Sequence, residues 1–174
     1  MNKIISAVFV LLLSFVAIHA QAQNRPVFPD ENELKVKEDY PKYEPLVISA
    51  AEWLVETDID KQTDIRQATN IFILRWTTGS PNVSIVIEKP HMKLLDNNPP
   101  LIPVYLANYA SYCISHQSYK DQIEPTKSAL IAISKVYKKG IGVNKNKALE
   151  KLAEVIERQQ LDEYVNKNMK PAQK

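Results

Sequence analysis

One stretch decides the fold class of this chain: Glu124-Pro125-Thr126-Lys127-Ser128-Ala129-Leu130-Ile131-Ala132-Ile133-Ser134-Lys135-Val136-Tyr137-Lys138-Lys139-Gly140. Proline suits the first turn of a helix, where its missing N–H has no intrahelical partner. Apolar residues then return at steps of three and four and share one helix face, namely Ala129, Leu130, Ile133, Val136 and Tyr137. Lysines favour the carboxyl end of the helix dipole, and glycine can end a helix. The stretch therefore predicts an amphipathic helix from Glu124 to about Lys139.

Similar helical periodicity recurs on both sides of this stretch. Before it, apolar spacing predicts helices over 45–56, from 58 or 60 to 79, and over 104–116, with one short helical turn over 91–95. After it, the same spacing predicts helices from 144 or 146 to about 157 and over 161–169. Short polar breaks separate these runs, and the chain has only three glycines. We therefore expect an all-α fold, a compact array of five or six helices.

Residues 83–87 have a different period. Val83, Ile85 and Ile87 alternate with Ser84 and Val86, which is the pattern of a short β-strand. The sequence offers no second convincing strand, and an isolated strand leaves its backbone groups unsatisfied. Both a strand and an irregular connection stay open for this stretch.

Three segments divide the chain. Residues 1–22 combine the cation Lys3, a short apolar core and the small-x-small site Ala20-Gln21-Ala22, which is the pattern of a secretory signal peptide. Residues 23–43 carry three prolines and many charges, and we expect them to form an extended N-terminal arm. Residues 44–170 hold the helical periodicity and are expected to form a single helical domain.

The first segment also predicts where the chain works. We expect a soluble protein that is periplasmic or secreted after cleavage near Ala22 and Gln23, where a lipid-anchored protein would carry a cysteine. No apolar run reaches the roughly 20 residues that a membrane-spanning helix needs. The chain has 22 Lys and Arg against 20 Asp and Glu, and residues 1–22 remove only Lys3 from that balance. A charge so close to zero argues against nucleic acid as a partner.

The connection after the amphipathic helix resembles the hinge of a Sel1-type repeat, a relative of the tetratricopeptide repeat. Five residues match its Tyr-x-x-Gly-x-Gly-Val turn and the alanine of its second helix: Tyr137, Gly140, Gly142, Val143 and Ala148. The resemblance covers about residues 128–157 and occurs once, and Leu152-Ala153-Glu154-Val155 departs from the pattern. It implies stacked helical hairpins that serve as a scaffold for protein–protein contact, with no catalytic residues. A generic hairpin with a Gly-x-Gly turn is the alternative.

A polar turn after a tryptophan-containing helix is the first candidate for a functional edge. The run from Trp76 to Pro81 resembles the helix end of small exported proteins of Gram-negative bacteria, which implies export and no particular activity. Aromatic residues on other helices could line a ligand groove, although aromatics at helical spacing are more often core. The candidate binding residues are Trp76, Thr78, Gly79, Ser80, Tyr105, Tyr109 and Tyr112. A plain helix stop is the alternative for the turn.

Patterns for catalysis and metal binding are sparse. Cys113, the only cysteine, and His116 lie three residues apart and would share a helix face, so a thiolate–imidazole pair is one interpretation. A buried, inert cysteine beside a histidine at a helix end is the other. The sequence shows no metal-ligand spacing, phosphate-binding loop, nucleophile elbow or EF-hand loop. We therefore predict no catalytic residues, no metal site and no cofactor.

The sequence supports two kinds of functional hypothesis, a protein-binding module and a ligand binder or enzyme. Neither hypothesis predicts an oligomeric state. The leading one is an exported helical domain that binds a protein or envelope partner without catalysis. The alternatives are a small-ligand binder with an aromatic groove, or a hydrolase with a Cys113/His116 centre. An exposed face with clustered aromatics would favour the leading hypothesis, and a closed bundle without an exposed apolar patch would count against it.

Overall fold

The computed structural model describes residues 28–30 and 33–169, and the predicted signal peptide at 1–22 lies outside them. Within the described residues the fold is all-α, as the sequence predicts. A 3₁₀-helix, η2 (Lys37–Tyr43), leads into the α-helices. These are α2 (Glu44–Glu56), α3 (Thr63–Gly79), α4 (Lys89–Leu95), α5 (Leu101–His116), α6 (Ile123–Lys138), α7 (Lys147–Glu157) and α8 (Leu161–Asn168). The expected count of five or six is exceeded because the short turn at 91–95 is a full helix, α4.

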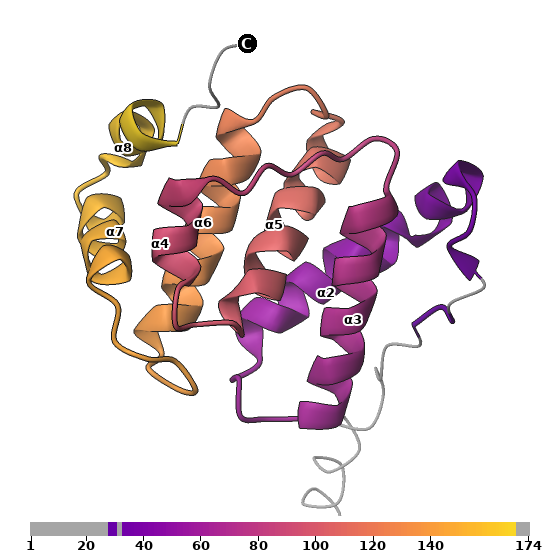
Figure 1. Cartoon of the computed structure of the whole chain (residues 1–174), viewed down its shortest axis with the longest axis horizontal. Coiled ribbons are helices and arrows are strands. Elements are labelled where there is room, and N and C mark those ends of the chain that lie inside the picture. The colour runs from indigo at the N-terminus through magenta and orange to yellow at the C-terminus, as the bar shows by residue number, and fades with distance from the viewer. Residues whose placement is uncertain (1–27, 31–32, 170–174) are drawn as a thin grey trace, which may run out of the picture.

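Helix α5 lies at the centre of the molecule (Figure 1). It packs against α2, α3 and α6, while α7 and α8 pack against α6. Its inward residues Leu101, Val104 and Ala107 are all 0% exposed. The core of the described chain is therefore organised around one helix that has neighbours on several sides.

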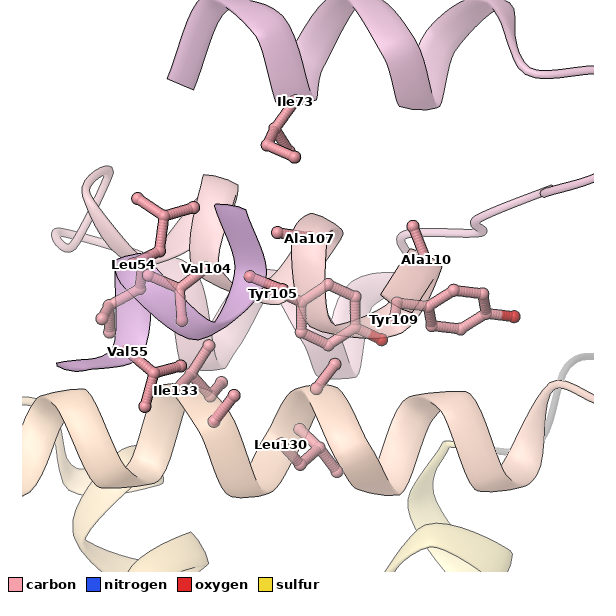
Figure 2. Close-up of a cluster of buried hydrophobic side chains, with 14 of the residues drawn as sticks. Leu54, Val55, Ile73, Val104, Tyr105, Ala107, Tyr109, Ala110, Leu130 and Ile133 are labelled. Atoms are coloured by element: carbon pink, nitrogen blue, oxygen red, sulfur yellow. The ribbon is translucent and has the colours of Figure 1, made fainter. Parts of the chain in front are cut away.

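Figure 2 shows how the neighbouring helices fill this core. Ala107 and Ala110 of α5 point toward α3 and its Ile73, so that a small side chain faces the neighbouring helix there. Leu130 and Ile133 approach from α6 on the other side. Burying each large aliphatic side chain contributes about 1.5–3 kcal/mol. Because Cys113 is the only cysteine of the chain, this burial has to stabilise the fold without an internal disulfide.

Residues 33–43 differ from the extended arm that was expected over 23–43. Leu34 and Tyr40 are buried, and η2 ends directly at α2. The indole nitrogen of Trp76 donates a hydrogen bond to the carbonyl oxygen of Tyr40 at 3.1 Å, and the two rings pack with centroids 6.2 Å apart. A buried indole N–H needs such an acceptor, and this requirement holds the segment against α3.

Helix α3 begins at Thr63, later than the predicted start at 58 or 60. The loop before it, at residues 57–62, makes side-chain contacts instead. The buried guanidinium of Arg66 donates to the carbonyl oxygens of Thr57 at 2.6 Å and Asp58 at 3.2 Å. The carboxylate of Asp58 pairs with Lys139 at 3.2 Å. The Asp58 carbonyl oxygen also accepts a hydrogen bond from the N–H of Lys61 at 3.0 Å, so residues 58–61 form a separate turn before α3.

The predicted Gly-x-Gly turn is present between α6 and α7. Gly140 and Gly142 both have positive φ, at 70° and 66°. Asn146 then caps α7, because its side-chain oxygen accepts hydrogen bonds from two N–H groups in the first turn at 2.8 and 3.2 Å. Its side-chain nitrogen donates to three carbonyl oxygens at the end of α4. One asparagine thus joins two helices, while a relationship to Sel1 repeats stays a prediction.

Residues 83–88, which connect α3 to α4, are extended but pair with no strand in the described part of the chain. Figure 1 shows this connection crossing α5 and α6 on its way from α3 to α4. Val83 is buried, Ile85 is half-buried and Ser84 is exposed. Val83 and Ile85 therefore face the helices without a sheet, whereas Ile87, the third residue of the alternation, is exposed.

Gly79 is needed for space and not for a left-handed turn. It is the last residue of α3 and is not among the glycines with positive φ. A Cβ atom on Gly79 would lie 1.8 Å from the Tyr40 hydroxyl oxygen and 2.6 Å from the adjoining ring carbon. The ring of Tyr40 would have to move away from α3 to admit a methyl group.

We expect Gly79→Ala to lower the free energy of unfolding by about 1–3 kcal/mol, because it overpacks the contact with Tyr40. Urea denaturation followed by circular dichroism measures this. Tyr40→Phe removes the nearest atom and should reduce the cost of Gly79→Ala in the double variant. Gly140→Ala is the control for backbone strain alone, since its Cβ would meet nothing within 4 Å. A Gly79→Ala variant as stable as the parent protein would contradict the close contact.

Candidate functional site

The predicted binding residues do not share one surface. Trp76, Tyr105 and Tyr109 are core residues, with 0%, 1% and 3% of their surface exposed. Their burial favours the alternative that the sequence left open, in which aromatics at helical spacing belong to the core, and a binding role for them stays a prediction. Figure 2 shows the rings of Tyr105 and Tyr109 inside the core around α5.

Thr78 and Ser80 do lie together, in an open groove at the carboxyl end of α3. The groove holds about 880 Å³ of space, part of it open solvent. Its walls are Thr77, Thr78, Ser80, Pro81, Val83, Ser84, Ile85 and Leu106. The hydroxyl groups of Thr77 and Thr78 donate to carbonyl oxygens of α3 at 2.7 Å. Their oxygens keep lone pairs that can accept a hydrogen bond from a ligand.

Tyr112 lies apart from this groove. Its ring stacks on His116 with centroids 4.0 Å apart. It borders a second, more apolar hollow together with Ile131 and Leu161. The rim of this hollow is charged, because Lys127 pairs with a carboxylate of α6 and one of α8 at 2.5 Å each. Tyr112 therefore lines a different hollow from Thr78 and Ser80.

Cys113 and His116 have the properties of structural residues. Cys113 is buried, and burial raises the pKa of its thiol to about 11. At neutral pH the thiol is therefore protonated, whereas a nucleophile has to be a thiolate. His116 is exposed, and its Nδ1 lies 3.0 Å from the carbonyl oxygen of Tyr112. Across residues 28–30 and 33–169, no three His, Cys, Asp or Glu side chains gather as a metal ion requires.

A buried polar cluster between α4 and α5 was missed from the sequence. His91 is 4% exposed, and its ring meets the ring of Tyr105 edge-on at 5.7 Å. The Nδ1 atom of His91 accepts a hydrogen bond from the Glu88 N–H at 3.1 Å. The hydroxyl of Tyr105 has no hydrogen-bond partner of good geometry among the described residues, although Thr126 is near enough to affect its pKa. The three-residue spacing of Glu88 and His91 at a helix start could have predicted this contact, because it is the spacing of a capping box.

These tyrosines are not poised for proton transfer. Burial is the main cause that raises the pKa of Tyr105 to about 12 and also raises that of Tyr109. A small pocket beside them is lined by His91, Tyr109, Thr126, Glu88, Val86, Gln122 and Met169. It is much smaller than the groove at α3, so the cluster is better suited to holding helices together than to holding a substrate.

Among the helices that the structure describes, none is both long and apolar enough to cross a membrane. No protein-family model, curated protein or solved structure matches the chain. The arrangement of its own residues is therefore the basis of the functional proposal.

We expect Cys113 to react with a thiol reagent only after the protein unfolds, because its thiol is buried and protonated. The reaction with 5,5′-dithiobis-(2-nitrobenzoic acid) at pH 7.5, followed by absorbance with and without denaturant, measures this. Rapid reaction of the native protein would contradict the structural role of Cys113 and would favour the hydrolase alternative.

We expect the protein to lose stability as the pH falls below about 6.5, because burial lowers the pKa of His91 in the folded state. The unfolded chain then binds a proton that the folded chain does not, so stability is full above the unfolded pKa. The loss is at most about 1.4 kcal/mol for each pH unit. Thermal unfolding from pH 8 to 5 measures it. His91→Gln should remove this part of the pH dependence and His116→Gln should retain it, and the reverse result would contradict the assignment.

Proposed function

We propose that this chain is an exported helical domain that binds a protein partner, without catalysis, through the groove at the carboxyl end of α3. The observation that carries the proposal is that this open groove is lined by Thr78 and Ser80, which belong to the polar turn that the sequence pattern indicates as a functional edge. Loops that stand beside a rigid helical core are common places for binding.

The chemistry of the groove suits a neutral polypeptide segment. None of its lining residues is charged. A phosphate, a nucleic acid or an anionic lipid surface would need cations there. The threonine and serine oxygens can accept hydrogen bonds from a peptide N–H, while Leu106 and Ile85 offer apolar contacts.

The alternatives have less support. An aromatic ligand groove needs exposed rings, whereas Tyr105 and Tyr109 are buried. A hydrolase with a Cys113/His116 centre needs a thiolate, whereas burial raises the pKa of Cys113 to about 11.

A photo-reactive benzophenone side chain placed at Thr78 should crosslink the protein to a defined protein partner in intact cells. The control position is Glu150, which is exposed on α7 and outside the groove. Thr78→Arg, which places a long cation in the groove, should prevent crosslinking from Ser80 while leaving thermal stability unchanged. Equal products from Thr78 and Glu150, a lipid product alone, or no product would contradict the proposed function.

A further inference from the structure

The extended segment beside the groove carries backbone groups that lack partners. Its ends are held, because the N–H of Val83 donates to the Ser80 hydroxyl oxygen at 3.3 Å and the N–H of Glu88 donates to His91 at 3.1 Å. Between them, the N–H and C=O groups of residues 84–87 make no hydrogen bond to any other described residue. An extended chain with free backbone groups is a template for strand pairing.

The side chains of this segment also favour pairing. Val86 is 45% exposed and Ile87 is 37% exposed, and β-branched residues of this kind are typical of strands. The run from Asn82 to Ile87 has no charge. Pro81 and Pro90 stand outside it on either side, and proline cannot donate to a ladder of hydrogen bonds. The segment therefore resembles a short, uncharged edge strand with a proline beyond each end.

We propose that a second copy of this chain pairs with this edge, so that the two 83–87 segments form an antiparallel two-stranded ribbon across a twofold axis. This inference rests on the proposed function, because it names the protein partner for the same region. The groove borders Val83, Ser84 and Ile85, so a partner paired there meets the groove as well.

The pattern of the segment is self-complementary in one register. In an antiparallel pair, residues directly opposite each other lie on the same face. A twofold axis at Ile85 sets Val83 opposite Ile87 of the second copy, so the face of the ribbon that carries Ile85 is apolar throughout. Ser84 falls opposite Val86 on the outer side. No two like charges face each other in this register, and the net charge of +2 opposes association only weakly.

The dimer is expected to be weak, because a ribbon of five residues a strand buries little area. Small interfaces belong to the transient class, and we expect a dissociation constant on the order of 100 µM. Each strand already lies on its own helices, which gives the ribbon the packed face that an isolated hairpin lacks.

Sedimentation of the purified protein between about 5 and 500 µM is the first test, because this range brackets a weak dissociation constant. We expect a reversible shift from monomer toward dimer. Ile85→Pro and Val86→Pro are matched variants, because the N–H groups of successive residues in a strand point to opposite edges. One of them should raise the dissociation constant at least about tenfold and the other should change it little. A monomer at every concentration would overturn the inference, as would equal effects of the two prolines.

Disulfide formation between copies tests the register. Ile85→Cys should form a crosslinked dimer under mild oxidation, since that residue faces itself. Val86→Cys alone should not, but a mixture of Ser84→Cys and Val86→Cys proteins should. Glu150→Cys measures chance collisions, and the parent protein shows whether the buried Cys113 contributes. A dimer that crosslinks at Glu150 as readily as at Ile85 would place the interface elsewhere and overturn the inference.

The failure of this inference is distinct from the failure of the proposed function. Crosslinking from Thr78 to a different protein, together with monomeric sedimentation, would keep the groove as a binding site and exclude the second copy. Crosslinking from Thr78 to a product of twice the chain mass supports both proposals.

Discussion

The burial of α5 on several sides at once is the constraint on which the rest of the structure depends. A helix that packs against α2, α3 and α6 has little surface left for solvent, and its residues from Leu101 to Cys113 are largely inside. A chain with one cysteine has no internal disulfide to replace this contribution. The remaining helices are arranged so that each covers part of α5 or of its neighbour α6.

This use of α5 explains why its tyrosines Tyr105 and Tyr109 are not presented to a ligand. Tyr105 and Tyr109 fill the core, and Trp76 is committed to the backbone of Tyr40. The segment that crosses the helices between α3 and α4 has the exposed groups that could bind a partner. Its backbone makes hydrogen bonds at both ends, but residues 84–87 make none to other residues that the structure describes, and the groove lies alongside. Residues 84–87 thus keep backbone groups that no other described residue satisfies.

Much of the fold could be predicted from the sequence, because amphipathic spacing is local. Helix α6, the Gly-x-Gly turn and the cap of α7 at Asn146 all follow from residues within one or two turns. The sequence was a weaker guide to which side chains are buried in the core. A helix covered on several sides is apolar on several faces, so the period of α5 left open whether its tyrosines face a groove or the core. The need for glycine at position 79 comes from Tyr40, 39 residues away, and no local pattern contains it.

Amide hydrogen exchange, resolved residue by residue at low and high protein concentration, tests the central claim most directly. The account predicts that the amides of α5 exchange slowest, since they open only when the core opens. It predicts that residues 84–87 exchange fast in the dilute protein and become protected on concentration. Protection of residues 84–87 in the dilute monomer, or α5 amides that exchange as fast as those of α8, would contradict it.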